Sequence, residues 1–243
     1  MLFNKKFDLI FSLGEACSCS QILRKCRLQF YSYPFDWLFG SDILTRAKIL
    51  ADDYKGFIDF EDLEDFGQTN KAPANLCEIY YNKKNNIHFN HDFAYGKTLQ
   101  ETYPKVREKY DRRAERQLKQ IEQSNKILFV YVQIPPNREE VSDETLAEVR
   151  NVLQKRFPKQ EITLLYLYCN YDNKNFELKE VSDEIVKAEY DYDGYIKELP
   201  YEVNRKALLK LFCKIKISTK FMDVKNLFRR LIFVTKSFFR GIL

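Results

Sequence analysis

The sequence predicts an α/β fold built around a mostly parallel sheet, and three observations support this. Two apolar runs, Lys126–Gln133 and Glu161–Cys169, have the length and composition of strands buried on both faces. Between them, from Ser142 to Phe157, apolar residues recur at helical spacing behind a capping Ser-Asp-Glu sequence. Alternation of strand and helix is typical of right-handed crossovers. We therefore expect a three-layer domain.

The chain begins with a predicted strand, a turn and a helix. Phe7–Phe11 is a short apolar run, Gly14 suits a tight turn, and Glu15–Lys25 repeats apolar or small residues at helical spacing. Cys17 therefore falls in the first helical turn, just beyond the carboxyl end of a strand. Unpaired N–H groups and the helix dipole stabilise a thiolate there and can receive a developing oxyanion. An inert, buried cysteine is the plainer interpretation of this local pattern.

The remaining elements follow from capping residues, apolar spacing and turn residues. The acidic stretch Phe57–Phe66 lacks the ligand spacing of a calcium loop and is expected to form a solvated turn or short helix. The other expected elements are a helix from Ser41 or Asp42 to Asp52, a hairpin of Cys77–Tyr81 and Ile87–Phe93, a helix over Thr102–Ser124, short strands over Phe176–Val181 and Ile185–Tyr190, and a helix near Tyr201–Cys213.

One set of motifs resembles a bacterial family of uncharacterised proteins described as papain-like cysteine peptidases. The residues that carry the resemblance are Ser12-Leu13-Gly14, Cys17, Leu23-Arg24-Lys25, Tyr33-Pro34-Phe35-Asp36-Trp37, Asn90-His91-Asp92-Phe93, and Lys109-Tyr110-Asp111-Arg112-Arg113 with Arg116. The resemblance implies that Cys17 is a nucleophile. It also implies a helical lobe beside an antiparallel barrel, whereas the alternation of strands and helices favours the α/β sheet with Cys17 at its carboxyl edge.

A cysteine nucleophile at neutral pH needs an imidazole within hydrogen-bond reach. The two histidines, His88 and His91, both fall in the second strand of the expected hairpin. His91 is the preferred base because it matches the family motif, and His88 is the alternative. By strand alternation the two rings face opposite sides. We expect Asp36 to orient the imidazole, because Asp92 is adjacent to His91 in a strand and would point to the opposite face. The plainer role of Asp36 is to accept backbone N–H bonds in a turn.

A further candidate site is an arginine group on the long predicted helix. Arg112, Arg113 and Arg116 offer planar forks that suit carboxylate or phosphate. The ordinary alternative is a solvated helix face that pairs with Glu108 and Glu115.

The last thirty residues differ in charge from the rest. They carry eight Lys or Arg and one Asp, a net charge of +7, whereas the first 213 residues carry 32 Lys or Arg and 34 Asp or Glu, a net charge of −2. Ser218–Leu243 predicts an amphipathic helix with one cationic and one apolar side, which suits an anionic membrane surface. The alternative is a helix docked on the protein itself. The expected membrane contacts are Phe221, Leu227, Phe228, Arg229, Arg230, Leu231, Phe238 and Phe239.

Composition bounds the other classes of function. At 243 residues and 45% hydrophobic content, we expect one α/β domain over residues 1–213 and the basic helix over 214–243. A near-neutral body argues against a nucleic-acid-binding domain. The seven glycines form no phosphate-binding loop, and no metal-ligand pattern occurs, so no cofactor or metal is expected. Six irregularly spaced cysteines and no visible signal peptide favour a cytoplasmic protein, peripheral to the inner membrane face. The oligomeric state is left open.

Three functions remain open from the sequence. The first is a thiol hydrolase acting on a peptide or acyl substrate, with Cys17 as nucleophile and His91 as base. The second is an enzyme that acts on a phosphorylated or glycan-linked substrate at the membrane and binds its anion through the three arginines. The third is a membrane-associated binding protein without catalysis.

Overall fold

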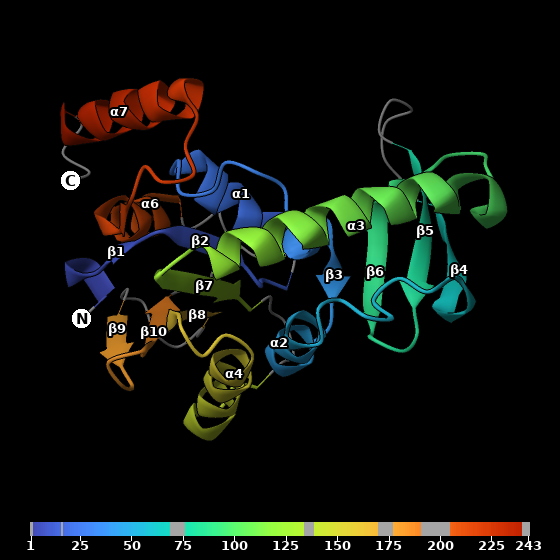
Figure 1. The fold of residues 1–243 in the computed structure, drawn as a ribbon, viewed down its shortest axis with the longest axis horizontal. Coiled ribbons are helices and arrows are strands. Elements are labelled where there is room, and N and C mark those ends of the chain that lie inside the picture. Colours follow the sequence, from blue (N-terminus) through green and yellow to red (C-terminus); the bar gives the residue numbers. More distant parts are fainter. Residues whose placement is uncertain are drawn as a thin grey trace.

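The structure is a computed structural model that describes residues 2–15, 17–68, 76–133, 139–169, 177–190 and 205–239. The chain has mixed α/β content arranged around two larger sheets and one two-stranded pairing (Figure 1). Residue 176 of a predicted short strand, residues 201–204 of a predicted helix and residues 240–243 of the tail lie outside the described residues.

The larger sheet is mostly parallel, as the sequence predicted. Its strands lie in the order β2 (Leu9–Ser12), β7 (Lys126–Val132), β8 (Glu161–Cys169), β10 (Ile185–Tyr190) and β9 (Glu177–Glu180). The first four run parallel to their neighbours, and β9 pairs antiparallel with β10 at the edge. The carboxyl ends of β2, β7 and β8 therefore meet at one edge of the sheet.

Alternate residues of β7 enter two hydrophobic clusters. Leu128 and Val130 pack with residues of α1 (Cys17–Lys25) and α6 (Arg205–Lys214). Phe129 and Tyr131 belong to a second cluster that contains residues of α2 (Ile43–Ala51) and α4 (Asp143–Arg156). This alternation explains why the strand is apolar at every position from Ile127 to Val132.

A second sheet of four antiparallel strands lies beside the first (Figure 1). Its order is β3 (Phe39–Gly40), β6 (Ile87–Ala94), β5 (Cys77–Asn82) and β4 (Leu63–Gln68). The predicted hairpin is confirmed as β5 and β6. The prediction for Phe57–Phe66 is wrong in part, because η3 (Phe60–Asp62) leads into β4, an edge strand whose side chains after Leu63 are all exposed.

The long helix α3 (Leu99–Glu122) runs along the second sheet and back toward the first (Figure 1). It begins three residues before the predicted start, because Thr98 and Glu101 form a capping box in which each side chain binds the other's backbone N–H. Predicted caps at two other helices are confirmed. Asp42 accepts from Thr45 N at the start of α2, and Ser142 accepts from Thr145 N at the start of α4.

A short parallel pairing joins the start of the chain to the segment between α6 (Arg205–Lys214) and the last helix. β1 (Lys6–Phe7) pairs with β11 (Lys216–Ile217), an element that the sequence did not predict. The single predicted strand Phe7–Phe11 is split at Asp8, whose carboxylate accepts from Asn125 N at 2.8 Å and Ser218 Oγ at 3.1 Å. The remaining elements are η1 (Leu2–Asn4), η2 (Pro34–Trp37) and α7 (Val224–Phe239).

The tail forms a helix over part of the predicted range, and the division of the chain at residue 213 stays a prediction. Among the described residues, none of the helices combines the length and the apolar character needed to cross a membrane.

Candidate active site

Cys17 lies at the carboxyl edge of the parallel sheet. Strand β2 ends at Ser12 opposite Val130, and the following turn continues the pairing, since Glu15 N donates to Val132 O at 3.4 Å. Cys17 is the first residue of α1 and its side chain is half-buried. A thiol at the first residue of a helix lies beside backbone N–H groups that have no partner within the helix, and these groups stabilise negative charge.

Gly14 lets α1 pack directly onto the turn. A Cβ atom at this position would lie 2.2 Å from Cys19 Cβ and 2.8 Å from Cys19 Sγ, so no larger residue fits. Cys19 itself is fully buried, and burial raises the pKa of its thiol to about 12. It is therefore a poor nucleophile, and Cys17 is the reactive candidate in this helix.

Arg46 fixes the turn that precedes Cys17. Its guanidinium is fully buried and donates to the carbonyl oxygens of Leu13, Gly14 and Glu15 on one side. On the other side it donates to Gly40 O, with Nη2 at 2.6 Å. The β2–α1 turn and β3 are thus joined through one buried cation.

Asp36 is a buried structural carboxylate in η2. Its Oδ2 accepts from Gln29 Nε2 at 2.7 Å, Tyr33 N at 2.9 Å and Arg24 Nη2 at 3.0 Å. Burial raises the pKa of Asp36, while the Arg24 charge and these hydrogen bonds act in the opposite direction. Ser20 Oγ, in α1, contacts the Asp36 carbonyl at 2.6 Å and the Cys17 carbonyl at 3.1 Å. The Asp36 carboxylate therefore accepts a backbone N–H within its own turn, which is the role the sequence left open. The Asp36 backbone carbonyl contacts Ser20 of α1.

The first histidine, His88, lies among aromatic rings on one face of β6. Its ring centroid is 4.6 Å from Phe66, 4.7 Å from Tyr81 and 5.8 Å from Phe39. Burial lowers the pKa of His88. β6 pairs with β3 at this point, with His88 opposite Phe39 and Ile87 opposite Gly40. The Arg46 guanidinium donates to the carbonyls of both Gly14 and Gly40. Because Gly40 pairs with Ile87, the His88 end of β6 is connected through β3 and Arg46 to the turn that precedes Cys17.

His91 lies farther along β6, at a cleft of about 510 Å³ between β6 and α3. His91 is three positions beyond His88 in the strand, so the two residues are about 10 Å apart at the usual rise per residue. A β-bulge shifts the β5–β6 register between Glu78 and Tyr80, and four successive residues of β6, from His91 to Ala94, line the cleft. Asp92 accepts from Lys109 and from Tyr110 Oη.

Of the three proposed catalytic residues, His91 lines the β6–α3 cleft and Cys17 and Asp36 do not. Cys17 is absent from the residues that line the β6–α3 cleft, whereas a different cysteine, Cys77, lines it together with His91 and Asp92. Figure 1 shows α1 at the parallel sheet and β6 in the antiparallel sheet, well separated in this view. The sequence offered only one signal for Cys77, its place at the start of the strand that pairs with the one carrying His91.

The three arginines have three different environments. Arg112 lines the cleft and pairs with Glu108 at 3.4 Å. Arg113 stacks over Tyr110, and Arg116 donates to Ser32 O at 3.1 Å and stacks over Tyr31. One arginine therefore faces the cleft, and the other two support the packing of α3.

Sequence reasoning missed a group of polar residues at the sheet edge near Cys17. Glu15 is almost fully buried there, and Tyr131 Oη donates to Ser41 O at 3.3 Å. Tyr166 Oη donates to Gln133 and accepts from Val141 N. The available signal was a polar Gln133 directly after an apolar strand. Among the described residues, no group of three His, Cys, Asp or Glu side chains is placed to hold a metal ion.

Comparison with known proteins places most of the chain in one family. Residues 8–172 match a family described as "Putative papain-like cysteine peptidase". The chain is also 27% identical over 182 residues to "Uncharacterized protein R408" of Acanthamoeba polyphaga mimivirus, which covers 69% of this chain and 80% of that protein. No solved structure matches the chain. The expected bacterial distribution stays a prediction, because this relative is viral. The family match spans more than half of the chain and includes Cys17, Asp36 and both histidines, so the chain belongs to this papain-like cysteine peptidase family.

Proposed function

We propose that the chain is a thiol-dependent hydrolase in which Cys17 is the nucleophile. One observation carries this proposal: Cys17 is the half-exposed first residue of α1 at the carboxyl edge of a parallel sheet, while Cys19 in the same helix is fully buried. Active sites of open α/β sheets gather at this edge. The family description supports a peptidase-like reaction, and acyl transfer uses the same chemistry.

The proposed reaction has two halves. The Cys17 thiolate attacks the acyl carbon, the N–H groups of the first turn of α1 receive the oxyanion, and an imidazolium protonates the leaving amine or thiol. Water, deprotonated by the same imidazole, then hydrolyses the acyl-enzyme. His91 is the proposed base because it matches the family motif, and His88 is the alternative because it lies at the end of β6 that connects to the Cys17 turn.

Selective alkylation of the full chain at pH 7 tests both parts. We expect iodoacetamide to modify Cys17 roughly tenfold faster than Cys77, the other half-exposed cysteine among the described side chains, because a thiolate is the reactive species. The rate at each cysteine is measured by peptide mass mapping. The variants His91→Ala and His88→Ala identify the base, since only the loss of the true partner reduces the Cys17 rate.

Two outcomes would overturn the assignment. If Cys77 reacts fastest and His91→Ala slows it, the reactive pair lies in the β6–α3 cleft. If both cysteines react at the same slow rate, the thiol mechanism fails, and the second candidate becomes the better one. That candidate is an enzyme that binds an anionic, phosphorylated or glycan-linked substrate in the cleft. Lys105, Lys109 and Arg112 line this cleft, together with Asp92, Glu101 and Glu108. Lys109 pairs with Asp92 and Arg112 with Glu108, so a substrate anion would have to displace these carboxylates.

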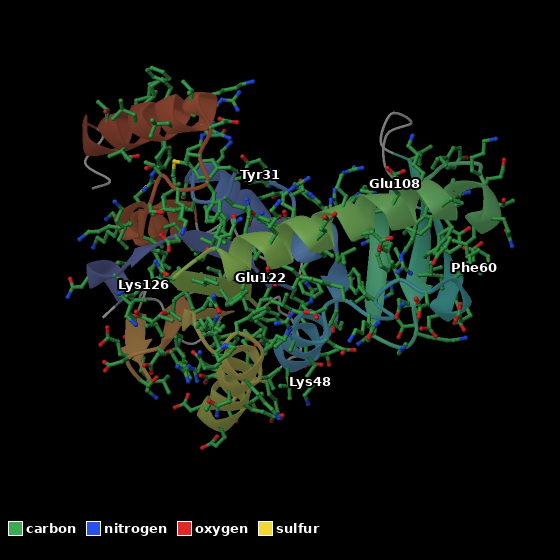
Figure 2. The ribbon with its side chains drawn as sticks, in the orientation of Figure 1. Tyr31, Lys48, Phe60, Glu108, Glu122 and Lys126 are labelled. Carbon is green, nitrogen blue, oxygen red and sulfur yellow. The ribbon has the colours of Figure 1, made fainter. Side chains whose placement is uncertain are left out.

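We also propose that α7 attaches the protein to an anionic membrane surface. Its apolar side faces outward: Leu227, Phe228 and Leu231 are all exposed, with Phe228 and Leu231 at 61%. Side chains project from the outer side of α7 away from the body (Figure 2). Arg229 on the same helix is exposed, so apolar and cationic groups are presented together.

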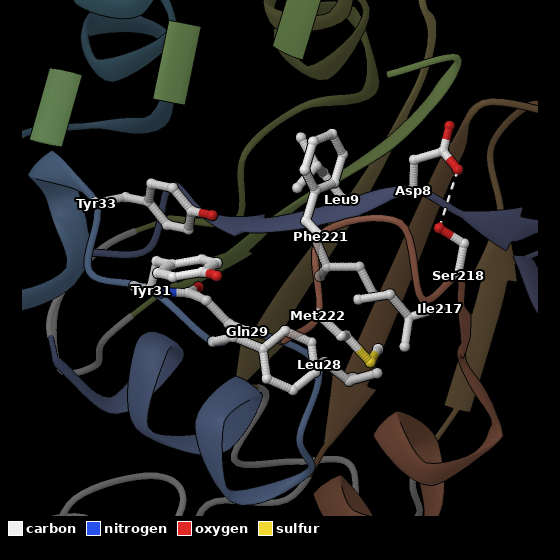
Figure 3. Close-up of a pocket in the computed structure, with 12 residues that line it drawn as sticks. Asp8, Leu9, Leu28, Gln29, Tyr31, Tyr33, Ile217, Ser218, Phe221 and Met222 are labelled. Atoms are coloured by element: carbon white, nitrogen blue, oxygen red, sulfur yellow. Dashed lines mark hydrogen bonds between the residues drawn. The ribbon is translucent and has the colours of Figure 1, made fainter. Parts of the chain in front are cut away.

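Two of the expected contacts face the protein instead. Phe221 precedes α7, lies beside Leu9 and lines, with Tyr31, a crevice of about 10 Å³, the size of one water molecule (Figure 3). Arg230 turns inward and donates to Cys26 O at 2.6 Å. The side chains of Phe238 and Phe239 lie outside the described residues. The proposed membrane contacts are therefore Leu227, Phe228, Arg229 and Leu231.

A matched pair of variants tests this attachment. We expect the double variant Phe228→Ser with Leu231→Ser to lose at least tenfold in co-sedimentation with phosphatidylserine-containing vesicles, because each exposed side chain contributes about 2 kcal/mol when it enters an apolar phase. Phe66→Ser is the control, since Phe66 on β4 is also 61% exposed but lies far from α7 in the chain. Equal sedimentation of the double variant and the wild type would contradict the proposal. Self-association that both serines abolish would instead assign this surface to a second copy.

A further inference from the structure

Two cysteines outside the proposed catalytic site lie against each other beneath α7. Cys26 directly follows α1, and Cys213 is in α6. Both helices contribute to the same hydrophobic cluster, and each thiol is the largest influence on the pKa of the other, so the two side chains are neighbours. Both are free thiols in the structure. They are 187 residues apart in the sequence, so any bond between them would link distant parts of the fold.

Residues of α7 surround this pair of thiols. Ser237 Oγ lies 3.9 Å from Cys213 Sγ. Arg230 donates to Cys26 O at 2.6 Å and to Ile215 O at 3.3 Å, which places its positive charge beside both sulfur atoms. Cys26 is fully buried, and Cys213 retains 5% exposure.

The two thiols have different acidities. The hydrogen bond from Cys26, the contact with Ser237 and the charge of Arg230 together lower the pKa of Cys213 to about 7, against burial. The same thiol–thiol hydrogen bond, together with burial, raises the pKa of Cys26. A thiol with a lowered pKa beside a thiol with a raised pKa is the arrangement of an attacking and a resolving cysteine.

We propose that Cys26 and Cys213 form an oxidation site, at which a peroxide oxidises the two thiols to an intramolecular disulfide. The Cys213 thiolate attacks one peroxide oxygen, breaks the O–O bond and becomes a sulfenic acid, while the other oxygen leaves as hydroxide and takes up a proton. The Cys26 sulfur then attacks the sulfenic sulfur, loses its proton and releases a second water. Two thiols and one hydrogen peroxide give one disulfide and two waters, so two electrons pass from sulfur to the peroxide.

The bond would have a defined structural effect. It would join the end of α1 to α6, beneath the helix that we propose binds the membrane. Since α1 begins with Cys17, oxidation would tether the helix that carries the nucleophile. The inference does not depend on the hydrolase proposal, because it uses different thiols and a different reaction.

Thiol counting on the reduced full chain tests the proposal. After exposure to a small molar excess of hydrogen peroxide and removal of the oxidant, we expect the titratable thiols under denaturing conditions to fall from six to four. Non-reducing peptide mapping should show the Cys26 peptide linked to the Cys213 peptide, with a mass loss of about two hydrogens. The product should migrate as a monomer on a non-reducing gel, and its urea midpoint should shift upward.

Serine variants identify the pair. Cys26→Ser and Cys213→Ser should each abolish the linkage, whereas Cys77→Ser should leave it intact. Because Cys26→Ser changes a buried residue, circular dichroism must show that it folds, and Cys213→Ala provides a second variant at the less buried position. A linkage that involves Cys17, or retention of all six thiols, would overturn the proposal. Conversion of Cys213 to a sulfinic acid while Cys26 stays free would also overturn it.

Discussion

Replacing Arg46 with alanine is expected to lower the free energy of unfolding by about 4 kcal/mol. Arg46 is 0% exposed, and its guanidinium donates to carbonyl oxygens in two segments: the β2–α1 turn, and the stretch that contains Leu38 and Gly40. Alanine would leave these buried carbonyls without a donor. Each hydrogen bond to a charged group contributes about 1.5–3 kcal/mol, and partial access of water to the opened space reduces the sum.

Urea unfolding followed by circular dichroism measures this change. Lys48→Ala is the control on the same helix, because Lys48 is 57% exposed and its ion pair with Glu148 at 3.4 Å is solvated. It should change stability by less than about 0.5 kcal/mol. Arg46→Lys should fall between the two, since an ammonium cannot span both groups of carbonyls as the planar fork does. A loss below 1 kcal/mol for Arg46→Ala would show that Arg46 is not what fixes the turn.

The second large effect is expected at Asp36. Alanine at this position should cost about 3 kcal/mol, because it leaves Gln29, the Tyr33 N–H and the Arg24 charge without their common acceptor. Arg24 retains 29% side-chain exposure, so water compensates it in part and the value stays at the lower end for a broken ion pair.

Two variants, Asp36→Ala and Asp36→Asn, separate a structural role of Asp36 from a catalytic one. Urea unfolding gives the stability change, with Asp42→Ala as control: Asp42 caps α2 at the surface and its loss should cost about 1 kcal/mol. Alkylation of Cys17 gives the second measurement. In folded Asp36→Asn protein we expect the Cys17 rate to stay close to the wild-type rate. A tenfold slower rate without loss of stability would restore Asp36 as the residue that orients the base.

Much of the fold could be predicted because local signals agreed with the tertiary structure. The apolar run over Lys126–Gln133 is uniform because β7 is buried on both faces, and helix starts at Asp42 and Ser142 carry capping side chains. The strand β4 was missed because its solvent-exposed edge residues are acidic and lack the usual apolar alternation. The short strand β11 has two residues, too few to give any periodic signal.

The candidate site could be predicted only in part. Cys17 was placed correctly at the end of a strand and the start of a helix, since Gly14 and the helical spacing are local features. The position of His91 was not predictable, because the β-bulge in β6 changes which side chains share a side. The apolar side of α7 faces outward because Arg230 on the same helix turns inward and donates to Cys26 O and Ile215 O. A helical wheel cannot show these hydrogen bonds, so the direction was not predictable.

The pairing of β1 with β11 bears on where this fold can be cut. The family match covers residues 8–172, yet Phe7, β10 and α6 all contribute to the cluster that packs against α1. An isolated fragment with those limits would lack one wall of the core and expose the apolar side of β7 and β8 to solvent. The segment that matches the family is thus smaller than the hydrophobic core of the fold, and we expect a fragment of residues 8–172 to be less stable than the full chain.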